Sequence, residues 1–158
     1  DTFEFWCPAR RPEGQNILLS LSKGLHMFDS NFLVNGVDRP TVTSNAWVAD
    51  PTDPNPSIEI VWNKKQRISK LVLFFDTDFD HPMESVLMTH PERVMPFCVR
   101  EYKILDDKGN IIYEKEDNFQ TINAILFDGF VETEKLVVSM THPSNNVPAA
   151  LFGIRCYA

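Results

Sequence analysis

The sequence predicts an all-β fold, an antiparallel jelly-roll β-sandwich, on three observations. Val, Ile and Phe occur in short bursts separated by turn residues, and no long segment has helical periodicity. In Ser57–Trp62, Ile58 and Ile60 share one face with Trp62, which is the period of two of a half-buried strand. Many short strands with Pro- and Gly-rich connections are typical of sandwiches and jelly rolls. We expect strands at Ser57–Trp62, Ile68–Phe79, Val99–Leu105, Ile111–Tyr113, Thr121–Phe127, Lys135–Met140 and Leu151–Tyr157.

Turn residues define the connections between these strands. Asn35 and Gly36 tolerate positive φ and Pro40 removes a backbone donor, so this segment is predicted to be loop, with Asp38 bonding to its own backbone. The segment Asp106–Asn110 lies between two β-rich runs, and its glycine supplies the left-handed position that a hairpin loop needs. We therefore expect a β-hairpin there.

Composition limits the class of protein. A chain of 158 residues, with 43% hydrophobic and 23% charged residues, is expected to form one soluble globular domain. Its formal net charge of -7 argues against binding to duplex nucleic acid or an anionic membrane surface, because both need a concentrated basic face. No apolar run approaches the roughly 20 residues of a membrane helix.

Cysteines and catalytic motifs offer little chemistry. Cys7, Cys98 and Cys156 are odd in number and lack CxxC spacing, so buried free thiols are expected. The alternative is one disulfide with a spare thiol, which would indicate an oxidising compartment. The sequence contains no GxGxxG loop, GxSxG elbow or HExxH motif, so this chain alone is not expected to be an enzyme.

A sugar site would need an aromatic ring to stack on a sugar face and planar polar groups to bind hydroxyls. The available residues are Trp47, His90, Arg93 and Arg100. Trp47 has a second interpretation as a core plug at the end of the sandwich, since Trp buries a large area and has one donor to satisfy.

The segment between Asp80 and Phe97 is more apolar than a solvent loop needs to be. It contains Met83, Met88 and Met95, with Arg93 at its polar rim. A loop this rich in Met and Pro either folds over its own core or packs against a partner. We therefore regard it as a candidate partner surface, with the core interpretation left open.

Two further patterns invite a metal or catalytic interpretation. Carboxylates alternate at three positions: Asp76, Asp78 and Asp80. They could bind a hard cation, but a solvated strand end is the preferred interpretation. Proline follows three histidines: His81, His90 and His142. This pattern favours loop entry, with the imidazole capping nearby backbone.

The order of the predicted elements carries a resemblance to the discoidin or coagulation-factor C-type family, whose domains are galactose-binding-like jelly rolls. The segments concerned are NFLVNGVDRP, SNAWVAD, SIEIVWNKKQRISKLVLFFDTDFD, VREYKILDDKG and FGIRCY. Related sugar-binding modules hold a structural calcium in the loop before the tryptophan, largely through main-chain carbonyls. The resemblance implies that Asn35, Asp38 and Thr41 surround such an ion, and a bare turn is the alternative.

A closer resemblance is to the discoidin-like domain at the C-terminal end of bacterial FAD-dependent oxidoreductases, carried by FDTDFDHPMESVL, HPERVMPFCVREYKIL and PAALFGIRCY. It begins at about Gln15, so residues 1–14 are expected to be an N-terminal extension or linker and residues 15–158 the discoidin-like domain. It implies that FAD belongs to a neighbouring domain of a parent protein, in the bacterial cytoplasm or exported.

Two functional hypotheses follow. The first is a non-catalytic accessory module that packs on or orients the flavin domain of its parent protein. The alternative is a carbohydrate-binding module that recognises a glycan at its loop end, near Trp47 and Arg93.

Overall fold

A computed structural model describes residues 27–77, 95 and 97–158 of the chain. Apart from one short 3₁₀ helix, the regular elements of this part of the chain are strands, so the predicted all-β class is confirmed. The elements are η3 (Ser30–Val34), β1 (Trp47–Val48), β2 (Ser57–Phe75), β3 (Tyr102–Leu105), β4 (Ile111–Lys115), β5 (Ile122–Met140) and β6 (Ala150–Tyr157). No described helix is long and apolar enough to cross a membrane.

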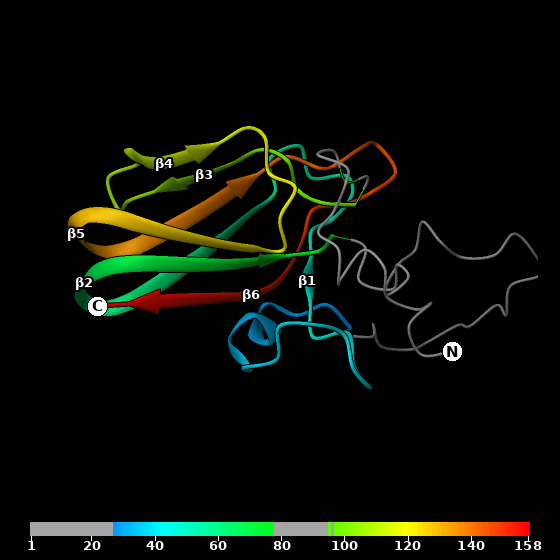
Figure 1. The fold of residues 1–158 in the computed structure, drawn as a ribbon, viewed down its shortest axis with the longest axis horizontal. Helices are drawn as coiled ribbons and strands as arrows, with labels where there is room; N and C mark the ends of the chain where they lie inside the picture. Colours follow the sequence, from blue (N-terminus) through cyan, green and yellow to red (C-terminus); the bar gives the residue numbers. More distant parts are fainter. Residues whose placement is uncertain (1–26, 78–94, 96) are drawn as a thin grey trace, which may run out of the picture.

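Two long strands, β2 and β5, pair antiparallel and bend back together, so that each contributes to both layers of a sandwich (Figure 1). In the first layer, the C-terminal part of β5 lies between the N-terminal part of β2 and β3, and β4 flanks β3. In the second layer, the C-terminal part of β2 lies between the N-terminal part of β5 and β6, and β1 flanks β6.

Irregular pairing in β2 and β5 forms the bend between the layers. Residues 62–65 bulge out of β2 between the Val61 and Gln66 pairs, and residues 127–130 bulge out of β5 on the other side of the corner. Gly129 has a φ of 81°, which favours glycine at this position. Bulges bend a strand without ending it. The sequence predicts separate strands on either side of each corner, and this prediction was wrong because bulged segments look like turns in the sequence.

The core lies between the layers. Its buried side chains come from both halves of β2 and β5 and from β3 and β6. The rings of Phe75 and Tyr102 meet across the layers, with 5.0 Å between their centroids. The fully buried members include Leu71, Leu73, Phe75, Ile104, Leu136, Val138 and Leu151. A second small cluster, Ala46 and Phe152 with Phe28, Val48 and Phe74 packed against them, covers part of the outer face of β6.

Several strand boundaries differ from the sequence prediction. The strand expected to reach Phe79 ends at Phe75, whose N–H donates to the carbonyl of Thr121 at 2.7 Å. Strand β3 begins at Tyr102 rather than Val99, because the carbonyl of Arg100 accepts from Asn118 in a connecting loop. The helix η3, which has an Asp29 side-chain cap, was not predicted.

The predicted hairpin at Asp106–Asn110 is confirmed between β3 and β4. The carboxylate of Asp106 accepts from the backbone N–H of Lys108 at 2.9 Å and of Asn110 at 2.8 Å. Gly109 has a φ of 81°, as the turn requires. Local turn chemistry is therefore sufficient to define this connection.

Candidate functional site

Connecting segments gather at the end of the sandwich opposite the bends of β2 and β5 (Figure 1). Those that the structure describes are residues 49–56, 76–77, 97–101, 116–121 and 141–149. In β-sandwich proteins, binding residues are commonly carried by such loops on a rigid scaffold. The polar contacts of this end, and of the loop before β1, therefore define what the domain offers to a ligand.

The loop before β1 closes around the side chain of Asn45, which is 4% exposed. Its Oδ1 accepts from Asn35 Nδ2 and from Thr43 Oγ1, both at 2.9 Å. Its Nδ2 lies 2.8 Å from Thr41 Oγ1, 3.2 Å from the Arg39 carbonyl and 3.3 Å from the Thr43 carbonyl. One carboxamide thus joins both ends of the loop.

A carboxylate and a guanidinium fasten the same loop onto strand β6. Arg155 Nη2 contacts the two carboxylate oxygens of Asp38 at 2.6 and 2.5 Å, and it lies 3.4 Å from the Gly36 carbonyl. A Cβ built on Gly153 would lie 2.7 Å from Asp38 Oδ1 and 3.3 Å from a ring carbon of Phe74. Asp38 was predicted to bond to its own backbone, which was wrong because this pair engages it instead.

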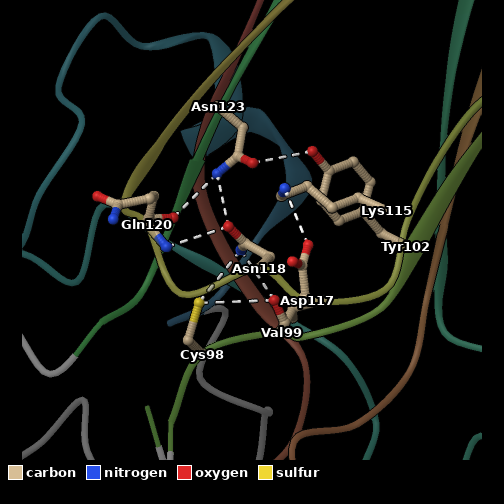
Figure 2. Close-up of polar contacts among 8 residues, drawn as sticks. All are labelled: Cys98, Val99, Tyr102, Lys115, Asp117, Asn118, Gln120 and Asn123. Atoms are coloured by element: carbon tan, nitrogen blue, oxygen red, sulfur yellow. Dashed lines mark hydrogen bonds and ion pairs between the residues drawn. The ribbon is translucent and has the colours of Figure 1, made fainter. Parts of the chain in front are cut away.

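A buried polar network connects the segment before β3 to the loop before β5 (Figure 2). Asn118, only 1% exposed, donates from Nδ2 to the Val99 carbonyl at 2.9 Å and to the Cys98 sulfur at 3.3 Å. Its Oδ1 accepts from the N–H of Gln120 at 3.0 Å. The network therefore holds two loops that have no strand pairing to fix them.

The network extends into the core through Asn123. Asn123 Nδ2 donates to Asn118 Oδ1 at 3.0 Å and to the Gln120 carbonyl at 2.9 Å, while its Oδ1 accepts from the hydroxyl of Tyr102 at 3.0 Å (Figure 2). Burial, with the neighbouring Tyr113, raises the pKa of Tyr102 well above its usual range. Tyr102 is therefore a neutral hydrogen-bond donor at physiological pH.

The thiols are not suited to nucleophilic chemistry. Burial, with the nearby Asp76, raises the pKa of Cys98 to about 12, and burial raises the pKa of Cys156 to about 11. The thiolate is the reactive form of cysteine, so both are inert at neutral pH. Both are free, as the sequence predicts, while Cys7 lies outside the described residues.

His142 joins two loops at this end of the sandwich. Its Nδ1 accepts from the N–H of Ala149 at 2.9 Å, so its Nε2 carries the proton and donates to the carbonyl of Asp53 at 2.7 Å. This confirms for His142 the predicted role of capping nearby backbone. His81 and His90 lie outside the described residues.

A shallow groove of about 150 Å³ lies on the first layer, near its loop end. Lys103 in its wall forms a 2.7 Å ion pair with Glu114, and this hydrogen bond raises the pKa of Lys103. The same residues of β4 line a more open hollow that includes Tyr113 and Asp117. The groove is lined by Glu101, Tyr102, Lys103, Glu114, Lys115, Glu116, Ser139, Met140 and Thr141.

The residues predicted as a ligand or partner surface do not form one cluster in the described part of the chain. Trp47 lies half-buried on β1 and packs against the core, and Met95 is itself a core residue. Arg100 is exposed before β3, beside the Asn118 loop. The remaining predicted residues, Met83, Met88, His90 and Arg93, lie outside the described residues, as do Asp78 and Asp80.

The predicted calcium ligands all make contacts with other side chains of the protein. Asn35 donates to Asn45, Thr41 Oγ1 accepts from Asn45, and Asp38 is paired with Arg155. Calcium takes six to eight oxygens at about 2.3–2.6 Å, and the oxygens that converge in this loop already surround an amide nitrogen. The residues do not fit a calcium ion in this arrangement. No cluster of three or more His, Cys, Asp or Glu side chains suited to a metal exists among the described residues.

Sequence reasoning missed the polar residues that organise the loop end. Asn45 gave no signal, and Asn118 and Asn123 were overlooked, because single asparagines in β-rich sequence are usually assigned to turns. Gly153 was also missed, since a glycine whose neighbour is 115 residues away leaves no local pattern. One usable signal was the clustering of Asn and Gln in the segment DNFQTIN, which interrupts two apolar strands.

The sequence matches no protein-family model and no curated protein at a significant level. Solved structures with the same fold include the family 32 carbohydrate-binding module of Streptococcus pneumoniae EndoD. That match has a TM-score of 0.60 at 13% identity and covers 87% of this chain and 90% of the module.

Two other matches have bound sugars. The family 32 module of Clostridium perfringens NanJ, in complex with galactose, has a TM-score of 0.56 at 14% identity over 87% of this chain and 90% of its own. The second chitosan-binding module of a Paenibacillus chitosanase/glucanase, in complex with chitotriose, has a TM-score of 0.56 at 16% identity over 85% and 89%. These likenesses establish the fold: the chain is a jelly-roll β-sandwich with a galactose-binding-domain-like fold.

Proposed function

We propose that this chain is a non-catalytic carbohydrate-binding module. The observation that supports it is the likeness to carbohydrate-binding modules over 85–87% of the chain, whereas the sequence carries no catalytic motif. Burial also makes both described thiols unreactive, which agrees with a binding role rather than a catalytic one.

The groove on the first layer is the proposed sugar site. Its walls carry carboxylates, hydroxyls and two ammonium groups, which are the donors and acceptors that bind sugar hydroxyls, and its volume suits a single sugar ring. Tyr113, in the adjoining hollow, is a half-buried aromatic residue on the edge strand β4, and like Trp47 it also packs against the core. The loop end near Trp47, predicted from the sequence, is the rival location.

Isothermal calorimetry with galactose, N-acetylgalactosamine, fucose and chitotriose tests the proposal. These are sugars named in solved structures of this fold or chemically close to them. Glu116→Ala should weaken binding about tenfold, because a hydrogen bond to a charged group contributes about 1.5 kcal/mol. The matched control is Glu132→Ala, an exposed glutamate on the corner of β5.

The outcomes separate the possible sites. Loss of heat in the Glu116 variant alone supports the groove, whereas loss in Trp47→Ala alone moves the site to β1. No heat with any of the sugars at millimolar concentration would contradict the carbohydrate-binding proposal itself.

A second proposal is the accessory module of a flavin-dependent oxidoreductase, docked on its catalytic domain. The favouring observation is an apolar row on the outer face of β5, where Ile122 is 61% and Leu126 is 76% exposed. The double variant Ile122→Lys with Leu126→Lys should abolish co-purification with the parent catalytic domain. The control Val42→Lys introduces the same charge at another exposed apolar residue, in the loop before β1. Unchanged co-purification in the double variant would contradict docking through this face.

A further inference from the structure

The loop before β1 contains a convergence of oxygens that would ordinarily attract a cation. Three oxygens converge on Asn45 Nδ2: the carbonyls of Arg39 and Thr43 and the hydroxyl of Thr41. Each lies 2.8–3.3 Å from this nitrogen. Three oxygens directed at one point have unfavourable electrostatics unless a donor or a positive charge lies between them. In this chain the donor is the amide nitrogen of Asn45.

We infer that the Asn45 carboxamide takes the place of a cation in this loop, and that the domain therefore folds without calcium. The amide NH₂ supplies two hydrogens to the three oxygens, while its own oxygen accepts from Asn35 and Thr43. The carboxylate of Asp38, the one acidic group among the predicted ligands, is neutralised by Arg155. No uncompensated negative charge is left among those ligands to bind a divalent ion.

The backbone at this position supports the same assignment. Asn45 is the one non-glycine residue with positive φ in the described part of the chain, at 46°. Asparagine tolerates this conformation better than other residues with a side chain. Asn45 therefore meets a backbone requirement and a side-chain requirement together, directly before the buried Ala46 that packs on Phe152.

The loop closed by Asn45 also helps to cover the outer face of the second layer. Phe28, Ala46 and Val48 lie on either side of the loop closed by Asn45 and pack with Phe74 and Phe152 on the outer face of the sheet. The side-chain amide is always present in the loop, whereas the occupancy of an ion site depends on the concentration of the ion. The stability of this cover should therefore be the same with and without divalent cations.

Thermal unfolding of the chain, after treatment with chelator, tests the inference. The melting temperature should be the same in millimolar EDTA and in millimolar CaCl₂, and Asn45→Asp should lower it by about 5 °C or more in EDTA. Asp is nearly isosteric with Asn and tolerates the same φ, so this variant removes the donor and leaves the backbone preference in place. The control is Asn63→Asp, the same change at an exposed position on the corner of β2.

A saturable rise in the melting temperature of the unmodified chain with CaCl₂ would overturn the inference, and this measurement needs no variant. An Asn45→Asp protein as stable as the Asn63→Asp control in EDTA would overturn it as well. If Asn45→Asp does not fold, Thr41→Val removes one of the three oxygens. It should lower the melting temperature equally in EDTA and in CaCl₂, and a larger loss in CaCl₂ would show that Thr41 had bound the ion.

Discussion

The contact between Gly153 and Asp38 predicts that Gly153→Ala destabilises the domain. Gly153 does not have positive φ, so an alanine there meets no backbone strain, and the cost is steric. The new Cβ would lie 2.7 Å from Asp38 Oδ1, well inside ordinary contact distance. The carboxylate cannot retreat without lengthening its 2.6 and 2.5 Å contacts with Arg155.

The expected magnitude follows from these two effects. Overpacking a well-packed position costs about 1–3 kcal/mol. Weakening a partly exposed ion pair adds up to about 1 kcal/mol. We expect a total of about 2–3 kcal/mol, and the melting temperature should fall by about 4–12 °C for a chain of this size.

A double-mutant cycle measured by urea unfolding assigns this cost to its cause. In an Asp38→Ala background the atom that would clash is gone, so Gly153→Ala should cost less than about 1 kcal/mol. An equal cost in both backgrounds would show that Asp38 is not responsible. An unchanged free energy of unfolding for the single variant would refute the reasoning outright.

Three further predictions concern the core and the corner. Asn118→Ala should lower the free energy of unfolding by about 2–4 kcal/mol in urea titrations, since it leaves the buried Val99 carbonyl and Asn123 amide without this partner; a change below about 1 kcal/mol would contradict this. Stability should fall as pH rises above about 9, because thiols of the unfolded chain ionise there, whereas burial raises the pKa of Cys98 to about 12 and that of Cys156 to about 11 in the folded protein. Unfolding titrations at about pH 8–10.5 should therefore show a flatter pH dependence for Cys98→Ala. An identical slope in the variant and the unmodified chain would contradict the assignment. Gly129→Ala should cost about 1–2 kcal/mol in the same titrations through strain at a φ of 81°, while Gly129→Asn costs less; equal costs would show that the strain lies elsewhere.

How far the sequence could predict the fold depended on the range of the interactions involved. The alternation in Ser57–Trp62 and the turn at Asp106–Asn110 involve neighbours two to four residues apart, and both predictions were confirmed. The bends at residues 62–65 and 127–130 could not be recognised, because a bulge that bends a strand has the same local composition as a turn that ends it.

The candidate sites also divide into features set by neighbouring residues and features set by the tertiary structure. Histidine before proline correctly indicated a backbone-capping role for His142. The calcium ligands were assigned by resemblance, whereas in the structure Thr41 Oγ1 accepts from Asn45 and the Asp38 carboxylate pairs with Arg155. The groove on the first layer combines residues from β3, β4 and the end of β5, which are adjacent in space through strand pairing alone.

By itself the sequence determined that this protein is an all-β sandwich with a loop before Trp47 and a hairpin at residues 106–110. Strand alternation and turn chemistry are written in residues close together in the chain. Only the tertiary structure decided that β2 and β5 each span both layers, that Asp38 pairs with Arg155 and that Asn118 joins two loops. These contacts depend on the tertiary arrangement, which brings together residues far apart in the chain, such as Asp38 and Arg155 at a separation of 117 positions.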